Sequence, residues 1–384
     1  MAGKIITHAQ YNTNRVEEYY KHIVNKEEFI LPRRYQKPKR IGIGAQGTVC
    51  SAYDLSRNNE KVAIKKLTKA FSKNHDAKRA YREIFLMKRM KHPSIINLLN
   101  LFTPCQTIDN FNHIYVTMEC LDANLNQLKS MLLDHPRIQF IGYQMLSAVN
   151  YLHKCGVAHR DLKPSNIVIN SHCVIKLLDF GLARSMLDLD HKPNPILTPY
   201  VVTRYYRAPE IILSIPYGVE VDLWSVGCIL AELITKHPLM PGENLVDQWD
   251  KVCDIVGTPP LKFFDKVLAE DVKCYCLHRP RKAAINFNEK FPDQLFGGDP
   301  GIEHEHNCHL ARHIISKLLI IDPADRISVE EALQHEYFSF FFDPSSLTPD
   351  YTGPFPEARF ETGGTIEDWK YLIWEEIHSF VPED

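Results

Sequence analysis

The stretch that most constrains how this chain can fold and act runs from His159 to Glu210. It begins with His159-Arg160-Asp161-Leu162-Lys163-Pro164-Ser165-Asn166 and continues to Asp179-Phe180-Gly181. It then passes Thr198-Pro199-Tyr200 and closes at Ala208-Pro209-Glu210. We expect the rest of the chain to position a nucleotide and a substrate against this stretch.

The residue types in this stretch suit phosphoryl transfer from ATP. That reaction needs a carboxylate near the acceptor hydroxyl, a cation on the transferring phosphate and oxygen ligands for Mg²⁺. Asp161 is the candidate for accepting the hydroxyl proton, and Lys163 can neutralise the γ-phosphate. Asn166 and Asp179 offer hard oxygen ligands, which suit Mg²⁺ and not Zn²⁺. The alternative is that the two aspartates are structural carboxylates in an inactive protein.

A glycine-rich segment, residues 42–49, comes earlier in the chain. A dinucleotide-binding turn would lead into a helix, whereas Thr48-Val49-Cys50 favours a strand. A P-loop would need Lys and then Ser or Thr after Gly47, where this chain has Thr48-Val49. The form G-x-G-x-x-G-x-V fits throughout, and its glycines let backbone N–H groups approach phosphates. A plain hairpin with glycines for turn geometry is the alternative.

One lysine and one glutamate are predicted to meet in the first part of the chain. Val62-Ala63-Ile64-Lys65 predicts a strand, in which a lone lysine is usually a solvated charge. The next segment has helical periodicity, with Glu83 on the inward stripe of Ala80, Ile84 and Met87. Because an unpaired buried carboxylate is costly, Glu83 needs a cation, and Lys65 is the candidate.

The remaining chain divides into a polar beginning, a strand-rich part and a helical part. Residues 1–34 show only weak helical periodicity near Val16–Ile23. Ile114–Met118 reads as a buried strand, followed by a connector over 119–124. Residues 221–233 are apolar nearly all round and predict a buried helix, within which Asp222 must be hydrogen-bonded.

Composition narrows the class of protein. A chain of 384 residues at 45% apolar and 24% charged is typical of a soluble globular protein, and we expect one bilobal unit. With 45 basic and 47 acidic side chains, no global charge favours nucleic acid or an anionic membrane. Ten scattered cysteines indicate free thiols in a reducing compartment. With no signal or spanning segment, we expect a cytoplasmic location and leave nuclear entry open.

These motifs together resemble the eukaryotic protein kinases over about residues 35 to 340. Thr198-Pro199-Tyr200 looks like the dual-phosphorylation lip of a mitogen-activated protein kinase, and its central Pro is most similar to the c-Jun N-terminal kinases. Stretches such as Asp247-Gln248-Trp249 and the tail 365–373 agree.

The resemblance implies an α+β bilobal kinase fold, with a small antiparallel sheet and one key helix in the first lobe and a larger, mostly helical second lobe. The implied organisation is an extension over 1–34, an N-lobe over 35–118, a hinge over 119–124, a C-lobe over 125–340 with an insert near 242–289, and a C-terminal extension over 341–384 that packs back on the kinase.

The resemblance also implies roles for individual residues. It makes Asp161, Lys163, Lys65 and Glu83 catalytic, and Asn166 and Asp179 ligands of Mg²⁺. ATP contacts are implied at Ile41, Gly42, Ile43, Gly44, Ala45, Gln46, Gly47, Thr48, Val49, Ala63, Lys65, Met118, Glu119, Leu121, Asn124, Val168 and Leu178.

The lip is implied to act as a switch. An upstream dual-specificity MAP kinase kinase would phosphorylate Thr198 and Tyr200, and a phosphothreonine carries about −1.5 to −2 charge that clustered guanidinium groups can hold. The implied phosphate-coordinating residues are Arg79, Arg82, Arg160 and Arg184 for Thr198, with Arg204 and Arg207 for Tyr200. Arg79 and Arg82 could otherwise be a solvated pair.

The family implies a monomer that phosphorylates Ser/Thr-Pro sites of proteins such as transcription factors, and that binds docking-motif peptides and scaffolds. Asp343 matches the family's acidic docking segment, but Ser346 stands where a second acid is expected. His172 and Asn126 also depart from the subfamily's usual acid and cysteine. The chain is therefore expected to be a divergent member whose docking partners transfer least well.

Three other hypotheses remain open at this stage. The dense run His304, His306, Cys308, His309 and His313 could bind a metal, although a solvated helix edge is favoured. Cys274 and Cys276 would lie on opposite faces of a strand and chelate poorly. The whole chain could also be a kinase-shaped scaffold that binds ATP without turnover.

Overall fold

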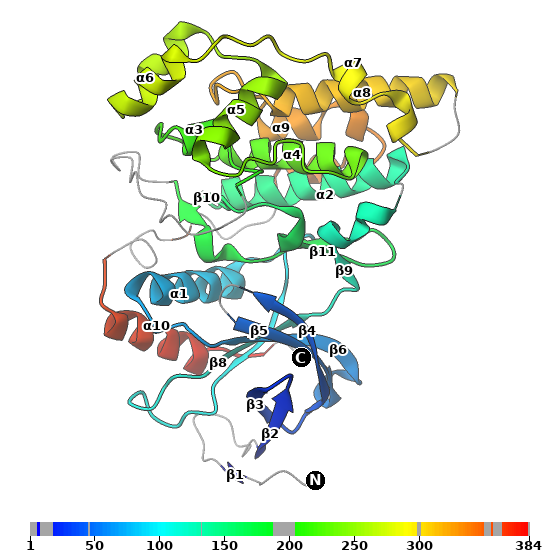
Figure 1. The fold of residues 1–384 in the computed structure, drawn as a ribbon. Helices are drawn as coiled ribbons and strands as arrows, with labels where there is room; N and C mark the ends of the chain where they lie inside the picture. Colours follow the sequence, from blue (N-terminus) through cyan, green and yellow to red (C-terminus); the bar gives the residue numbers. More distant parts are fainter. Residues whose placement is uncertain are drawn as a thin grey trace. The chain divides into compact units, whose positions relative to one another are not determined.

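The structure is a computed structural model that describes residues 6–7, 18–44, 47–131, 133–186, 204–297, 301–348, 355 and 363–382. The chain divides into two compact units (Figure 1). The first comprises Met1–Lys91, Ile96–Leu121 and Ala358–Asp384, and the second comprises His92–Ile95 and Asp122–Glu357. We describe each unit by itself.

The first unit is built on a five-stranded antiparallel sheet. Its spatial order is β4-β5-β6-β8-β7. The strands are β4 (Tyr35–Gly44), β5 (Gly47–Asp54), β6 (Glu60–Leu67), β7 (Leu98–Phe102) and β8 (Ile114–Glu119). One face of the sheet covers a core that includes Phe29, Tyr35 and Tyr115. Strands β6, β7 and β8 are buried along most of their length, whereas β4 is mostly exposed. The predicted glycine hairpin and the two later strands are confirmed.

A smaller sheet at the start of the chain overturns one expectation. Residues near Val16–Ile23 were expected to show helical periodicity, but β2 (Glu18–Val24) pairs with β3 (Glu27–Pro32), and β1 (Ile6–Thr7) pairs with β2. The turn has positive φ at Asn25 (50°) and Lys26 (72°), a combination that matches the twist of a tight hairpin. Period-two burial of Phe29 and Leu31 then outweighs a short, weak helical pattern.

Two helices complete the first unit. Helix α1 (Asn74–Arg89) buries the stripe that carries Glu83. Helix α10 (Ile366–His378) begins at a capping box on Thr365 and lies beside α1 (Figure 1). The contact is both apolar and ionic. The ring centroids of Tyr81 and Trp369 are 5.6 Å apart, and Glu376 accepts from Lys88 at 2.9 Å and Arg89 at 2.8 Å.

The second unit is mostly helical. Its helices are α2 (His135–Lys154), α3 (Pro209–Ile212), α4 (Val221–Thr235), α5 (Leu245–Val256), α6 (Glu270–His278), α7 (Phe287–Lys290), α8 (Ile302–Leu318) and α9 (Val329–Leu333). Helix α4 is buried along nearly its whole length and contacts both α2 and α8. The buried helix predicted over 221–233 is confirmed, because a helix that is apolar nearly all round is stable only when it is covered on all sides.

Short strands in the second unit lead into the segments that begin at His159 and Asp179. Strands β9 (Ala123–Asn124), β11 (Ile167–Ile169) and β12 (Ile175–Leu177) form one small sheet in the order β12-β11-β9. Strand β10 (Val157–Ala158) pairs with β13 (Arg184–Ser185). The segments that begin at His159 and Asp179 therefore leave from paired strands.

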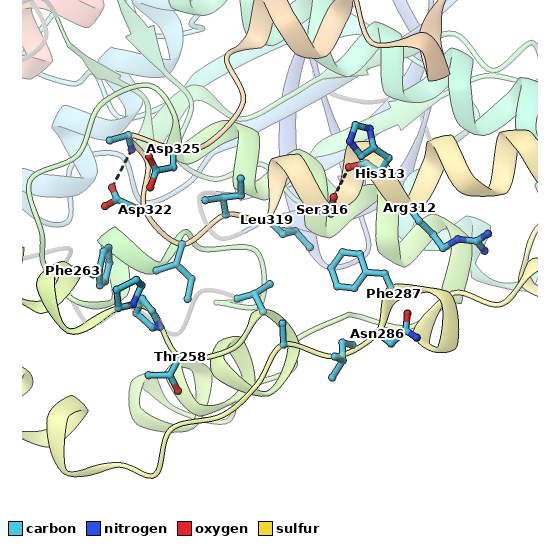
Figure 2. A pocket seen from close by; sticks show the side chains of 18 of the residues that line it. Thr258, Phe263, Asn286, Phe287, Arg312, His313, Ser316, Leu319, Asp322 and Asp325 are labelled. Carbon is cyan, nitrogen blue, oxygen red and sulfur yellow. Dashed lines mark hydrogen bonds between the residues drawn. The ribbon is translucent and has the colours of Figure 1, made fainter.

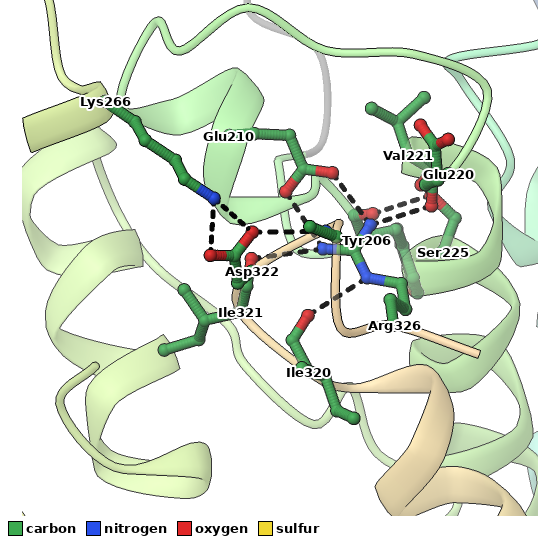
Figure 3. A network of polar contacts seen from close by, with 11 residues as sticks. Tyr206, Glu210, Glu220, Val221, Ser225, Lys266, Ile320, Ile321, Asp322 and Arg326 are labelled. Atoms are coloured by element: carbon green, nitrogen blue, oxygen red, sulfur yellow. Dashed lines mark hydrogen bonds and ion pairs between the residues drawn. The ribbon is translucent and has the colours of Figure 1, made fainter. Parts of the chain in front are cut away.

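An ion pair buried in the second unit holds the end of the 159–210 stretch (Figure 3). The guanidinium of Arg326 donates to both carboxylate oxygens of Glu210, at 2.7 and 3.0 Å, and neither side chain is exposed. It also donates to the backbone carbonyls of Glu220 at 2.7 Å and Ile320 at 3.0 Å. Such bidentate pairing with further hydrogen bonds is the condition under which buried charges are tolerated.

The cysteines show one further difference from expectation. Cys274 and Cys276 lie in helix α6 and not in a strand, because the Glu270–His278 segment has acidic residues in its first turn and a helical hydrogen-bond pattern. All ten cysteines fall in the described residues and are free, as expected. Among the described helices, none is both long enough and apolar enough to cross a membrane.

Candidate active site

The loop after β10 brings the predicted catalytic residues of the second unit together. Asp161 is buried, and its Oδ2 accepts a hydrogen bond from Lys163 Nζ at 2.6 Å. The same oxygen accepts from Asn166 Nδ2 at 3.0 Å, and that amide nitrogen also donates to the Asp161 carbonyl at 2.9 Å. A short 3-10 turn, Pro164–Asn166, makes this approach possible. The carboxylate is thus held in one orientation by two donors.

Asp222 of helix α4 holds the backbone of this loop by hydrogen bonds. Asp222 is fully buried, and its carboxylate accepts from the backbone N–H groups of His159 and Arg160, both at 2.8 Å. His153 Nε2 lies 3.1 Å from the same carboxylate. Burial alone would raise the pKa of Asp222, but the hydrogen bond from His153 and the neighbouring donors hold its pKa below the ordinary value. The requirement that Asp222 be hydrogen-bonded is confirmed.

Arg160 has an unusual backbone conformation that Asp222 makes possible. Its φ of 65° lies in the left-handed region, which is unfavourable for a residue with a long side chain. The side chain is also held, because Nε donates to the Leu182 carbonyl at 2.9 Å and Nη1 donates to Tyr217 Oη at 2.5 Å. Strain at this position therefore persists because backbone and side chain are both fixed.

Asp179 approaches the same loop from the other segment. His159 Nδ1 accepts from the Asp161 N–H at 3.3 Å, while Nε2 lies 3.0 Å from the Leu178 carbonyl, so the Nε2–H tautomer satisfies both contacts. The Leu178 N–H also donates to the Asn166 carbonyl at 2.8 Å. Asp179 follows with a φ of 63°, and its Oδ1 accepts from the Gly181 N–H at 3.3 Å. The backbone of Asn166 is therefore hydrogen-bonded to Leu178, the residue just before Asp179, and this bond brings the two predicted Mg²⁺ ligands near one another.

The first unit holds the predicted ion pair. Lys65 Nζ donates to Glu83 Oε1 at 2.6 Å, and the two side chains are 11% and 3% exposed. The pairing inferred from the inward position of Glu83 is confirmed. Lys65 is opposite Val49 and Ala63 is opposite Met118 in the sheet. Because opposed and alternate residues share a face, Val49, Ala63, Lys65 and Met118 lie on one face of the sheet, the face on which Lys65 meets Glu83.

The remaining predicted nucleotide contacts fall into four groups. Ile41 and Ile43 are exposed on β4, with 50% and 67% accessible, as expected for a hairpin that lacks a packing partner there. Asn124 pairs with Val168 in the small sheet of the second unit, and Leu178 directly follows β12. Ala45 and Gln46 lie outside the described residues. The others, within β4, β5 and β8 or just after β8, are Gly42, Gly44, Gly47, Thr48, Glu119 and Leu121.

Comparison with known proteins decides the family. The model of the protein kinase domain matches residues 35–338. A protein named "Stress-activated protein kinase JNK" from Suberites domuncula is 45% identical over 363 residues, which cover 94% of this chain and 98% of the relative. A protein of the same name from Drosophila melanogaster is 44% identical over 368 residues, covering 96% and 97%.

The chain belongs to the protein kinase family. Its similarity over nearly its full length makes it a JNK-like, stress-activated MAP kinase, which is a Ser/Thr protein kinase and an ATP user. The kinase fold, with a five-stranded sheet and helix in its N-terminal unit and a mostly helical C-terminal unit, is confirmed.

The predicted lip falls within the described residues from Arg204 onward. Thr198 and Tyr200 lie outside the described residues. Arg184 is in β13 opposite Ala158, and Arg204 Nη1 donates to the Glu243 carbonyl at 2.9 Å. The Arg207 N–H donates to the Arg204 carbonyl at 3.1 Å and so closes the turn that precedes α3. On α1, Arg82 is buried and Arg79 is half-buried. The two arginines therefore do not form the fully solvated pair that was the alternative to phosphate binding.

The predicted docking residue Asp343 and a large pocket both lie in the second unit, and neither involves the predicted catalytic side chains. Hydrogen bonds from the Ser345 hydroxyl and from the Ser345 N–H, the latter at 2.9 Å, hold the pKa of Asp343 below its ordinary value. A pocket of about 1210 Å³ lies among residues 256–325 (Figure 2). It is lined by residues such as Phe263, Phe287 and Leu319, and none of the predicted catalytic side chains contributes to it.

Sequence reasoning did not recognise what holds the catalytic loop in place. It identified Asp222 as needing partners, but it did not name the His159 and Arg160 N–H groups as those partners. The available signal was an acid inside an otherwise apolar helix. Tyr217, which accepts from Arg160, had no signal in the sequence.

Proposed function

We propose that this JNK-like kinase transfers the γ-phosphate of ATP to Ser/Thr-Pro sites of proteins such as transcription factors, using Asp161 as the residue that orients the acceptor hydroxyl. The observation that supports this most is the convergence of Lys163 and Asn166 on the Asp161 carboxylate, at 2.6 and 3.0 Å. The two donors hold the carboxylate in one orientation beside a cation, which is the arrangement that orienting an acceptor hydroxyl beside a phosphate requires.

Asp161 would orient the attacking hydroxyl and accept its proton. Lys163 would neutralise charge on the transferring phosphate. Because the transition state of phosphoryl transfer is loose, positioning and charge neutralisation contribute more than base strength. The fixed backbone around Arg160 keeps the Asp161 carboxylate in place during this step.

Asn166 and Asp179 fit Mg²⁺. Asn166 uses its amide nitrogen for Asp161, which leaves its carbonyl oxygen as the atom it can offer to a cation. Asp179 adds a carboxylate, and two hard oxygen donors are the usual protein contribution to a Mg²⁺ site. When bound, Mg²⁺ neutralises phosphate charge and ATP supplies the phosphoryl group.

Lys65 would hold the α and β phosphates, with Glu83 keeping its ammonium group in position. The glycine hairpin, β4–β5, would bring backbone N–H groups to the phosphates. Gly47 has no room for a side chain, because a Cβ there would lie 1.8 Å from the Lys66 carbonyl oxygen. This supports a glycine required by close backbone packing at that position.

The lip would control the enzyme through phosphorylation of Thr198 and Tyr200 by an upstream dual-specificity kinase. Arg79, Arg82, Arg160 and Arg184 would receive the phosphothreonine, and Arg204 and Arg207 the phosphotyrosine. Guanidinium groups suit this role because they pair bidentately with phosphate oxygens. The coupling would reach Glu83 directly, since Arg82 precedes it on α1.

Partners and location complete the proposal. Asp343 would contribute to binding of basic docking peptides and scaffolds, weakened by Ser346 and His172. The kinase would act as a monomer in the cytoplasm and enter the nucleus to reach transcription factors. The lobe boundaries at 35–118 and 125–340, with the hinge at 119–124, stay a prediction.

The test is transfer of labelled phosphate to a Ser-Pro peptide after an upstream kinase has acted on the chain. Wild type should transfer, Asp161→Asn should lose almost all kcat, and the exposed control Asp265→Asn should match wild type. Thr198→Ala should reduce kcat strongly. If wild type and Asp161→Asn transfer equally little while both bind ATP, the chain is a scaffold and the proposal fails.

A further inference from the structure

Three side chains of the second unit with metal-binding atoms meet at one place, away from the catalytic loop. They are His135, His304 and Cys308. One ring nitrogen of each histidine and the Cys308 Sγ all lie within 4.8 Å of one another. His135 and Cys308 are buried, and His304 is half-buried.

The fold brings these residues together from two helices. His304 and Cys308 are four residues apart on α8, so their side chains lie on the same face of that helix. His135 is the first residue of α2, whose N-cap is Asp134. The His135 ring stacks on Phe296, with centroids 4.8 Å apart and planes at 19°. Packing therefore fixes the imidazole before any ligand arrives.

The distances suit a tetrahedral metal. Cys308 Sγ lies 3.4 Å from His135 Nε2. With Zn–S of about 2.3 Å and Zn–N of about 2.0–2.1 Å, a tetrahedral zinc ion separates sulfur and nitrogen by about 3.6 Å. The other separations among the three ligand atoms are at most 4.8 Å. His304 is the most exposed of the three residues, so its side chain has the most room to rotate toward a shared ion.

An outer partner orients His135. Its Nδ1 lies 3.3 Å from Tyr337 Oη, so a hydrogen bond on that side leaves Nε2 facing Cys308. Metal-binding histidines commonly have such a partner on the other ring nitrogen. Nearby charge is also balanced, because Arg312 donates to the Asp293 carboxylate at 2.7 Å.

We propose that His135, His304 and Cys308 bind one Zn²⁺ ion, with water in the fourth position. A thiolate with two imidazoles is a ligand set that selects Zn²⁺ over Mg²⁺. The ion would link the start of α2 to α8, both of which contact the buried helix α4. It stabilises the second unit and takes no part in phosphoryl transfer.

The structure separates these ligands from the neighbouring histidines of the same helix. His306 is exposed and lies 3.4 Å from Glu336. His309 and His313 line the pocket of Figure 2, and His313 Nδ1 lies 2.8 Å from His335 Nε2. Of the metal cluster suggested by the sequence, only His304 and Cys308 therefore belong to the site, and His135 joins them from a distant segment.

The test uses the full-length chain without a histidine tag. Zinc measured by mass spectrometry should reach about one ion per chain. Titration of the metal-free chain with Co²⁺ should give a sulfur-to-cobalt charge-transfer band and the visible bands of tetrahedral cobalt. His304→Gln and Cys308→Ser should lose the charge-transfer band or weaken Co²⁺ binding by more than about 100-fold, since loss of an outer partner alone costs 10–100-fold.

Two control variants show whether the loss of Co²⁺ binding is specific to the proposed ligands. His306→Gln is on the same helix and Cys274→Ser removes an exposed thiol, and both should bind Co²⁺ like wild type. Because Cys308 is fully buried, folding of each variant is checked by circular dichroism, and His304→Gln gives an answer at a half-buried position. A wild-type chain with no charge-transfer band, or equal binding by folded His304→Gln, overturns the proposal.

Discussion

Replacing Asp222 by Asn should destabilise the second unit strongly, although the two side chains have nearly the same shape. The carboxylate accepts from the His159 and Arg160 N–H groups at 2.8 Å each and contacts His153 at 3.1 Å. An amide offers one oxygen, so its NH₂ group must face one of these donors. One charge-assisted hydrogen bond is lost, at about 1.5–3 kcal/mol, and a buried N–H is left unpaired, at about 1–3 kcal/mol.

The expected loss in the free energy of unfolding of Asp222→Asn is about 2.5–6 kcal/mol, a large fraction of the roughly 5–15 kcal/mol that stabilises a typical domain. Urea denaturation at neutral pH, followed by circular dichroism, measures it. The exposed control Asp265→Asn, whose side chain is 73% accessible, should change stability by no more than about 0.5 kcal/mol. A loss below about 1 kcal/mol for Asp222→Asn would refute the reasoning.

The same variant makes a prediction about pH. The folded-state pKa of Asp222 lies below its ordinary value, so its contribution is fully present above the unfolded pKa and is lost as pH falls through the folded pKa. The stability difference between wild type and Asp222→Asn should therefore be constant near neutral pH and shrink in acid, below about pH 4. A difference independent of pH would show that shape, and not charge, carries the effect.

Three further predictions concern other contacts. Arg326→Met should cost about 3–5 kcal/mol because it leaves the buried Glu210 carboxylate uncompensated, and adding Glu210→Gln should recover part of that loss in urea denaturation. Trp369→Ala should cost about 3–5 kcal/mol and release α10, seen as faster proteolysis of the C-terminal tail. Lys65→Met should abolish the rise in melting temperature that ATP causes in wild type, and an unchanged rise would contradict the proposed phosphate contact.

Much of the catalytic arrangement followed from local sequence. The spacing of Asp161, Lys163 and Asn166 places them in one short turn, so the contacts among them need little from the rest of the chain. Likewise, Glu83 on an inward helical stripe required a cation, and Lys65 supplies it. Predictions of this kind succeed because burial makes an unpaired charge costly wherever it occurs.

Short apolar patterns were less informative. The sequence predicts weak helical periodicity over 16–23, but the described part of that range, from Glu18 on, belongs to strand β2. It predicts a strand for Cys274 and Cys276, which instead form part of α6. In both cases the segment is too short for periodicity to separate the two structures. The hairpin partner β3 and the acidic first turn of α6 decided the outcome.

The sequence by itself determined which chemical groups this kinase brings together, since the residue types and their spacing supply a carboxylate, cations and oxygen atoms that suit Mg²⁺. Only the tertiary structure decided what holds them, and which histidines meet. Asp222 reaches the backbone of His159 and Arg160 from a separate helix, and His135 meets Cys308 across more than a hundred intervening residues. No local pattern predicts such pairs, because they depend on how helices pack and not on the spacing along one of them.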